Sequence, residues 1–254
     1  MRSRVQLQPS FVLHRRLYGE TSLLVEAFCV EFGRVGLVAK GARQRKAPWG
    51  ALLQPFRPLL LSWQGRSELG LLTGAEVAMP WSSMDGRALL SGFYLNELLL
   101  RLLPRHDPQP RLFESYGATV CHLTARGAEE PVLRIFEKRL LDALGYGLML
   151  DGEADLGQAI DPTAVYCYQI DRGPVRASGA GLGDMRVSGR TLLALAREQI
   201  DDPSELREAK CLLRRALQRQ LGGRPLVSRS LFRRSLDSQV PPGVASTRAR
   251  LSEI

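Results

Sequence analysis

The spacing of the apolar residues changes near Pro80, and this change constrains the fold more than any single motif does. Before it, short apolar runs with the length and composition of β-strands are separated by turn-like segments, at 11–17, 23–30, 35–39, 58–63 and 69–77. After it, apolar residues recur at helical offsets, as at Leu90, Tyr94 and Leu98. The chain is therefore predicted to be an α+β protein of more than one domain, with a boundary near residues 78 to 86.

The first domain, residues 1–80, is predicted to be a five-stranded OB-fold barrel. Closing five strands into a barrel removes the exposed edges that an open antiparallel sheet would leave. The OB-fold is a five-stranded barrel that is widely used to bind oligonucleotides. The periodicity is also compatible with a small sandwich or an SH3-like barrel.

The second domain, residues 81–238, is predicted to be mainly helical. Helices are expected at 87–103, 112–126, 132–144, 189–197 and 203–221. Between the third and fourth of these, an acidic and glycine-rich insertion near 150–180 is predicted to contain a hairpin around Asp171-Arg172-Gly173. Residues 239–254 have no apolar period and include Pro241-Pro242-Gly243, so a disordered tail is expected there.

Two stretches of the chain are rich in cations and contain no Asp or Glu. Seven basic residues lie between Gly33 and Ser67, and eight lie between Lys210 and Arg234. The whole chain has a formal charge of +9. Because clustered cations repel one another and cost stability, their presence without acids indicates a polyanionic partner, most simply a nucleic acid.

Contacts with nucleic acid are predicted in both stretches. The loop that follows Ala39 has four cations within seven residues, and Trp49 comes shortly after them. In proteins that bind single strands, cations of this kind contact phosphates and an aromatic ring stacks on a base. For Trp49, packing into the barrel core is an equally good interpretation. The predicted contacts are Arg34, Lys40, Arg43, Arg45, Lys46, Trp49 and Arg66 in the first stretch and Lys210, Arg214 and Arg215 in the second.

The patterns of several other protein classes are missing from the sequence. No apolar segment approaches the roughly 18 to 20 residues that a membrane-spanning helix needs, and the first residues lack the apolar core of a secretory signal. A cytoplasmic protein without a membrane partner is therefore expected. The four cysteines, Cys29, Cys121, Cys167 and Cys211, are far apart, so neither a metal nor another cofactor is predicted. Motifs of nucleophilic, phosphate-binding and zinc enzymes do not occur, and an enzymatic role is not expected.

Motifs in both domains resemble those of the RecO family of bacterial recombination mediators, over about residues 8 to 234. In the first domain they are Phe11-Val12-Leu13-His14, Tyr18-Gly19-Glu20-Thr21-Ser22-Leu23, Gly33-Arg34-Val35, Leu37-Val38-Ala39-Lys40-Gly41-Ala42-Arg43, Leu53-Gln54-Pro55-Phe56 and Pro58-Leu59-Leu60-Leu61. In the second they are Tyr94-Leu95-Asn96-Glu97-Leu98, Arg134-Ile135-Phe136-Glu137, Leu144-Gly145-Tyr146-Gly147, Leu221-Gly222-Gly223-Arg224-Pro225-Leu226, Ser228-Arg229 and Leu231-Phe232-Arg233.

The resemblance implies a non-enzymatic role in DNA repair and recombination, and association with the nucleoid. Members of the family bind single- and double-stranded DNA, anneal complementary strands and engage the acidic C-terminal tail of single-stranded DNA-binding protein. They act with RecR to load RecA onto gapped DNA. Many members also hold zinc with four cysteines in the C-terminal domain. The segment 150–180 of this chain contains only Cys167, so the metal is expected to be absent.

A receptor for that acidic tail, which ends in apolar residues and a carboxylate, needs an apolar groove beside cations. The helix expected at 132–144 offers both, and the resemblance makes Arg134 the strongest single candidate. The predicted peptide-binding residues are Arg134, Phe136, Lys138, Arg139, Phe232 and Arg233. Without the resemblance, the same residues favour an ordinary amphipathic helix with solvated charges.

Asn96 and Glu97 also match the family, but a polar pair on a helix that faces the barrel is predicted to anchor the contact between the domains. Two other functions remain open. One is an OB-fold RNA-binding module without a role in recombination. The other is a nuclease, which needs clustered carboxylates for metal ions. The acids at Asp151, Glu153, Asp155 and Asp161 form a single loop-like run, without a second supporting site.

Overall fold

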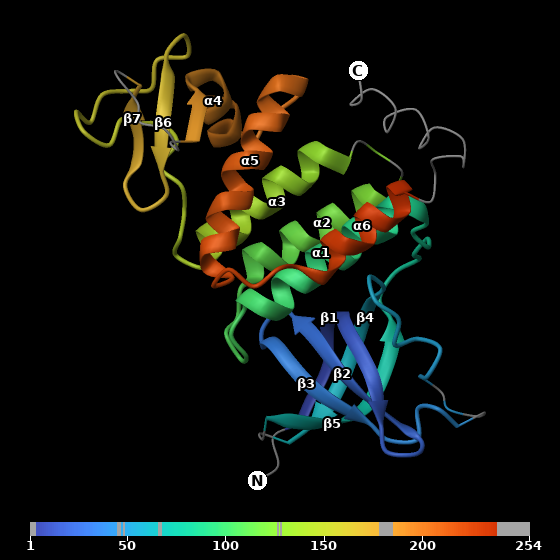
Figure 1. The fold of residues 1–254 in the computed structure, drawn as a ribbon. Coiled ribbons are helices and arrows are strands. Elements are labelled where there is room, and N and C mark those ends of the chain that lie inside the picture. The colour runs from blue at the N-terminus through green and yellow to red at the C-terminus, as the bar shows by residue number, and fades with distance from the viewer. Residues whose placement is uncertain are drawn as a thin grey trace.

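The computed structural model describes residues 4–44, 47, 49–65, 68–125, 127, 129–177 and 185–237, without the side chains of 233–237. The tail predicted at 239–254 lies outside these residues. The described part contains a closed barrel, a helical body and a small three-stranded sheet (Figure 1). The strands are β1 Arg4–Tyr18, β2 Ser22–Cys29, β3 Gly33–Ala39, β4 Pro58–Gln64, β5 Leu69–Val77, β6 Val165–Gln169, β7 Gly173–Arg176 and β8 Met185–Ser188. The helices are α1 Gly86–Leu102, α2 Pro110–Thr124, α3 Glu129–Ala143, α4 Gly189–Arg197, α5 Pro203–Gln220 and α6 Val227–Asp237.

The barrel has the strand order β1-β2-β3-β5-β4, closed between β4 and β1, and the predicted OB-fold is confirmed. Neighbouring strands are antiparallel except for β3 and β5, which are parallel. Strand β1 is longer than predicted because it serves two sides of the barrel. Its first half pairs with β4 and its second half pairs with β2. Register shifts occur after Val5 and after Val12, where bulges let the strand curve between the two partners.

The middle of β1 and most of β2 are buried on both faces, and this attaches the barrel to the helical body. Val12 and Val25 point into the barrel core, whereas Phe11 and Phe28 belong to the core of the helical body. The rings of Phe11 and Tyr116 are 5.1 Å apart and nearly perpendicular. Aromatic contacts of this geometry add to the stabilisation from burial, so the two domains share a continuous apolar contact.

A buried polar contact also joins the barrel to helix α1. The Asn96 side-chain amide donates to the Leu13 carbonyl at 2.8 Å, and its oxygen accepts from the Tyr116 hydroxyl at 2.6 Å. The prediction that Asn96 anchors the two domains is confirmed. The same prediction was wrong for Glu97. Its carboxylate accepts from the backbone N–H groups of Val227 and Ser228, at 2.9 and 2.8 Å, and therefore caps the N-terminus of α6.

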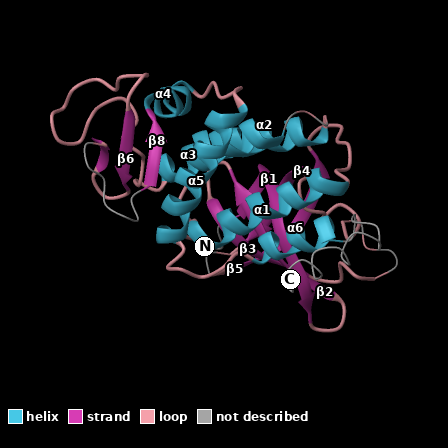
Figure 2. Cartoon of the chain, turned by 45° about the horizontal axis from the view of Figure 1, so that its top comes forward, coloured by secondary structure: helices cyan, strands magenta, loops and turns pink. Residues whose placement is uncertain are grey.

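Two elements were missing from the prediction, α6 and β8. Helix α6 receives its cap from Glu97 on α1, which is about 130 residues earlier in the chain, so no local signal marks its start. Strand β8 has four residues, of which Val187 is the buried apolar one. It completes the sheet β7-β6-β8 beside α4, at the far end of the helical body from the barrel (Figures 1 and 2).

Candidate functional site

A cavity of about 640 Å³ lies between α1, α3, α5, α6 and the segment 221–226. Pockets of this size hold small ligands or the side chains of a peptide. The apolar part of its lining consists of Leu90, Tyr94, Leu133, Leu221, Pro225, Leu226 and Phe232. The cations are Arg87, Arg134, Lys210, Arg214, Arg224 and Arg229, and the carboxylates are Glu129, Glu130 and Glu137.

A buried ion pair lies at one wall of this cavity. Arg134 donates to Glu137 at 2.6 Å, and the Tyr94 hydroxyl donates to the same carboxylate oxygen, also at 2.6 Å. Burial raises the pKa of Glu137, although the charge of Arg134 and the bond from Tyr94 oppose it. Arg134 is 4% exposed. The positive charge of Arg134 is therefore largely neutralised by Glu137 inside the protein.

The other carboxylates of the lining are also bonded to the protein. Glu130 accepts from Lys210 at 2.7 Å, and Glu129 accepts from the Ser91 hydroxyl at 2.9 Å. Burial pushes the pKa of Glu130 upward, but the bond from Lys210 and the nearby cations outweigh it and hold this pKa below its usual value. Four lining cations form no ion pair with any other residue that the structure describes: Arg87, Arg214, Arg224 and Arg229. An apolar cavity with unpaired cations suits an anionic ligand that also has an apolar part.

The predicted peptide-binding residues are not all at this cavity. Arg134 and Phe232 line it. Phe136 is fully buried beside Tyr116, at a ring distance of 6.2 Å, and is a core residue. The side chain of Arg233 lies outside the described residues. Sequence reasoning missed Arg224 and Arg229 as site residues, although both lie in motifs that carried the resemblance.

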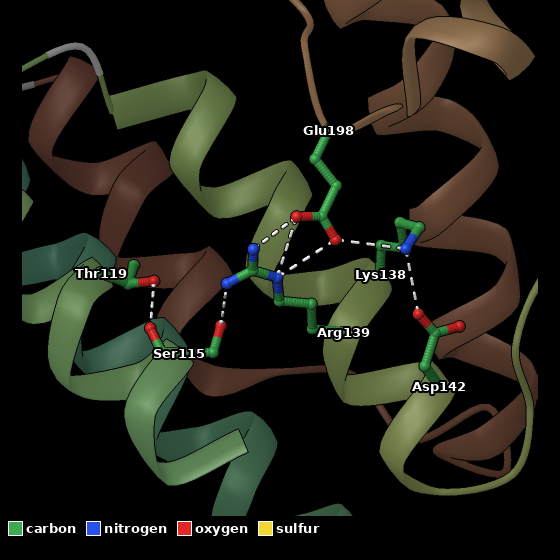
Figure 3. A network of polar contacts seen from close by, with 6 residues as sticks. All are labelled: Ser115, Thr119, Lys138, Arg139, Asp142 and Glu198. Carbon is green, nitrogen blue, oxygen red and sulfur yellow. Dashed lines mark hydrogen bonds and ion pairs between the residues drawn. The ribbon is translucent and has the colours of Figure 1, made fainter. Parts of the chain in front are cut away.

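Lys138 and Arg139 are instead part of a polar network between α2, α3 and the end of α4 (Figure 3). Glu198 accepts from Lys138 at 3.2 Å and from the Arg139 Nε at 3.1 Å. Arg139 also donates to the Ser115 hydroxyl at 3.3 Å. The hydrogen bonds from Arg139 are the main reason why the pKa of Glu198 is lowered. These two cations hold α4 against α3 and do not line the cavity.

The first basic stretch divides into structural and exposed cations. Arg34 donates to the Leu103 carbonyl at 3.1 Å and pairs with Glu26 at 3.5 Å, so it joins the barrel to the end of α1. Burial is the main cause that lowers the pKa of Arg34. Lys40 and Arg43 are exposed. Arg45, Lys46 and Arg66 lie outside the described residues, and Trp49 packs partly buried against the barrel core.

The second basic stretch divides along helix α5. Lys210 and Arg214 line the cavity, whereas Arg215 is exposed and is not part of the lining. Two neighbouring arginines of one helix thus lie in different surroundings. Arg214 and Arg215 were both predicted to contact nucleic acid. The structure places Arg214 in the lining of the cavity, where it could also contact a ligand bound there.

The division of the first stretch predicts different effects for Lys40→Ala and Arg34→Ala on binding of single-stranded DNA. Lys40→Ala is expected to reduce the slope of log affinity against log salt by about 0.7, the value for one lost phosphate contact. Arg34→Ala is expected to leave the slope unchanged and to lower the melting temperature, because it removes a contact between the domains. Titrations at four or more salt concentrations measure both slopes. Equal slopes for the two variants would contradict this division.

The acidic run from Asp151 to Asp161 precedes the small sheet, and Glu153 and Asp155 are bonded to side chains of that sheet and its β6–β7 turn. Glu153 is buried and accepts from Arg176 at 2.7 Å and from the Tyr166 hydroxyl at 3.2 Å. Asp155 pairs with Arg172. Among the described residues, no three His, Cys, Asp or Glu side chains lie close enough to hold a metal ion together. These bonds join the acidic segment to β6 and β7, and the nearby Cys167 is a buried free cysteine.

None of the described helices has the length and apolar character needed to cross a membrane. The structure therefore defines a class of protein in which a closed OB-fold barrel is attached to a helical body, with an apolar cavity that cations also line.

Comparison with known proteins identifies the family within this class. Residues 1–81 match the family described as "Recombination protein O N terminal", and residues 83–230 match "Recombination protein O C terminal". The DNA repair protein RecO of Nitrosococcus oceani is 52% identical over 229 residues, which cover 90% of this chain and 93% of the relative. That of Methylococcus capsulatus is 50% identical over 233 residues, covering 92% and 95%. That of Coxiella burnetii is 45% identical over 233 residues, covering 91% and 100%.

The chain belongs to the RecO family. Membership supports a role in DNA repair and recombination, and the predicted family is confirmed. The family is one of non-catalytic recombination mediators, in agreement with the prediction that this chain is not an enzyme.

Proposed function

We propose that this chain binds and anneals DNA strands and recognises the acidic, apolar-ended tail of single-stranded DNA-binding protein in the cavity of its helical domain. The observation that carries the proposal is the set of unpaired cations around apolar walls. Together with RecR, such a protein would help to load RecA onto DNA coated by that protein. A DNA-bound mediator of this kind would work at the nucleoid.

Each part of the tail has a counterpart in the cavity. The acidic residues and terminal carboxylate would be held by Arg214, Arg224 and Arg229, which form no ion pair within the described chain. The apolar end would pack on Leu226 and Phe232. A charge-assisted hydrogen bond to a carboxylate is about twice as strong as a neutral one, so these cations would set the affinity. Arg134 would act by positioning Glu137 and Tyr94 beneath the ligand, because it is already paired.

DNA binding would use exposed cations of both domains. Lys40 and Arg43 lie on the barrel, and Arg215 lies on α5. Annealing requires that two phosphate backbones are neutralised at once, and cations on two domains provide this charge without reading the base sequence. Competition between DNA and RNA of the same base sequence tests whether the protein prefers DNA.

Charge reversal at two neighbouring arginines tests the peptide site. Arg214→Glu is expected to weaken binding of a peptide with the acidic, apolar-ended sequence of the tail at least tenfold, because it places a negative charge in the lining of the cavity. Arg215→Glu, one residue further along α5, is expected to change this affinity less than threefold. Fluorescence anisotropy of a labelled peptide at physiological salt gives both values. Equal losses would exclude the cavity as the peptide site.

The annealing assay completes the test. Wild-type protein is expected to anneal complementary oligonucleotides whether they are bare or coated with single-stranded DNA-binding protein. Arg214→Glu is expected to fail more severely on coated strands than on bare ones. Failure of the wild type on both would overturn the annealing role.

A further inference from the structure

The turn between β1 and β2 exposes two large apolar side chains at the end of the barrel that points away from the helical body (Figure 1). Leu17 is 66% exposed and Tyr18 is 46% exposed. They are the last residues of β1 and pair with Leu23 and Ser22 of β2. The hairpin also projects from the barrel in the second view (Figure 2). Exposed apolar side chains are common on protein surfaces, and this turn differs from the others in the exposed cations that lie near it.

Three exposed cations lie near this turn. Arg16 is exposed on β1 directly before Leu17, and Lys40 is exposed directly after β3, whose last residue pairs with Leu23 of β2. Arg43 is tied to the turn itself. Its backbone N–H donates to the Thr21 carbonyl at 2.9 Å, and its guanidinium donates to the Glu20 carbonyl at 2.8 Å. The turn and the basic loop after β3 therefore form one surface.

We propose that this surface, consisting of Arg16, Tyr18, Lys40 and Arg43, binds unpaired bases of single-stranded DNA. Tyr18 stacks on a base, while the three cations contact the adjacent phosphates. Arg16 lies on the same face of β1 as Tyr18, because side chains two residues apart on a strand share a face. Exposed aromatic rings beside cations are the usual means of binding single strands without reading sequence. Duplex DNA hides its base faces in the stack, so the surface distinguishes single from double strands. The inference depends on the DNA binding proposed above and adds the residues that select unpaired bases.

The test compares Tyr18→Ala with Tyr18→Phe in the full chain. Fluorescence anisotropy measures binding to a labelled single-stranded oligonucleotide and to a blunt duplex of the same sequence. Tyr18→Ala is expected to weaken single-strand binding about 5- to 100-fold and duplex binding less than twofold. Tyr18→Phe keeps the stacking face and is expected to remain within twofold of wild type on both. The salt slope is expected to be unchanged in both variants, because no phosphate contact is lost.

Tyr146→Ala is the matched control, because Tyr146 is 54% exposed but lies outside the barrel, after α3. It is expected to bind both DNAs like wild type. Tyr18→Ala with unchanged single-strand binding, or with equal losses on single strands and duplex, would overturn the stacking site while leaving DNA binding intact. Absence of DNA binding by wild type would overturn the proposed function as well. Thermal melting of each variant shows whether a loss of binding reflects unfolding.

Discussion

Gly33→Ala is expected to lower the free energy of unfolding by about 3 to 5 kcal/mol, a loss typical of severe backbone and packing conflicts. Gly33 begins β3 with φ of +62°, a conformation that side chains other than glycine rarely adopt. A Cβ at this position would lie 2.1 Å from the backbone oxygen of Asp107 and 2.8 Å from its nitrogen. Neither atom can rotate away as a side chain does. The substitution would therefore force the barrel away from the segment that follows α1.

Gly19→Ala separates the effect of backbone conformation from that of the clash. Gly19 has φ of +59°, yet a Cβ there would meet no atom within 4 Å. Its loss is expected to be about 1 to 2 kcal/mol, the usual cost of the left-handed conformation. Denaturant unfolding of the two variants measures the difference. Similar losses for both would show that the approach of Asp107 to β3 does not constrain the fold.

Arg134→Ala is expected to destabilise the protein by about 3 to 5 kcal/mol at neutral pH, because removal of one partner leaves the other charge buried and uncompensated. The remaining group would be Glu137, which is 2% exposed. The double variant Arg134→Met with Glu137→Leu removes both charges and is expected to recover most of the loss. If the double variant is no more stable than Arg134→Ala, the buried ion pair is not the cause.

The loss caused by Arg134→Ala is expected to depend on pH. Burial already raises the pKa of Glu137 above its ordinary value of 4.5, and removal of the arginine takes away the charge that opposes this rise. A carboxyl whose pKa is higher in the folded state binds more protons when folded, so the variant loses stability as the pH rises above 4.5. The loss stops growing above the raised pKa of the folded variant. Unfolding curves for wild type and variant from pH 4 to pH 8 check this direction, and a deficit that grows toward low pH would contradict it.

These effects decide which variant best tests peptide binding. Arg134 was the strongest candidate from the resemblance, but its replacement changes stability together with the lining of the cavity. Arg214 lines the same cavity from the exposed side of α5 and forms no ion pair with any other described residue. A loss of binding in Arg214→Glu can therefore be assigned to the site itself.

The amino-acid sequence by itself determined the class of protein. Strand and helix periods are local properties, so the change near Pro80 was enough to predict a barrel followed by helices. The excess of cations was also visible, because charge is a matter of composition. Helix α6 was missed since its N-terminal cap, Glu97, comes from another helix.

The tertiary structure decided which of these cations are available to a partner. Arg34 and Lys40 belong to the same basic stretch, yet one joins two domains and the other is exposed. The cavity brings together Tyr94 and Phe232, which are distant in the chain. Local periodicity carries no information about such contacts, because they arise when separate helices bury their apolar faces against one another.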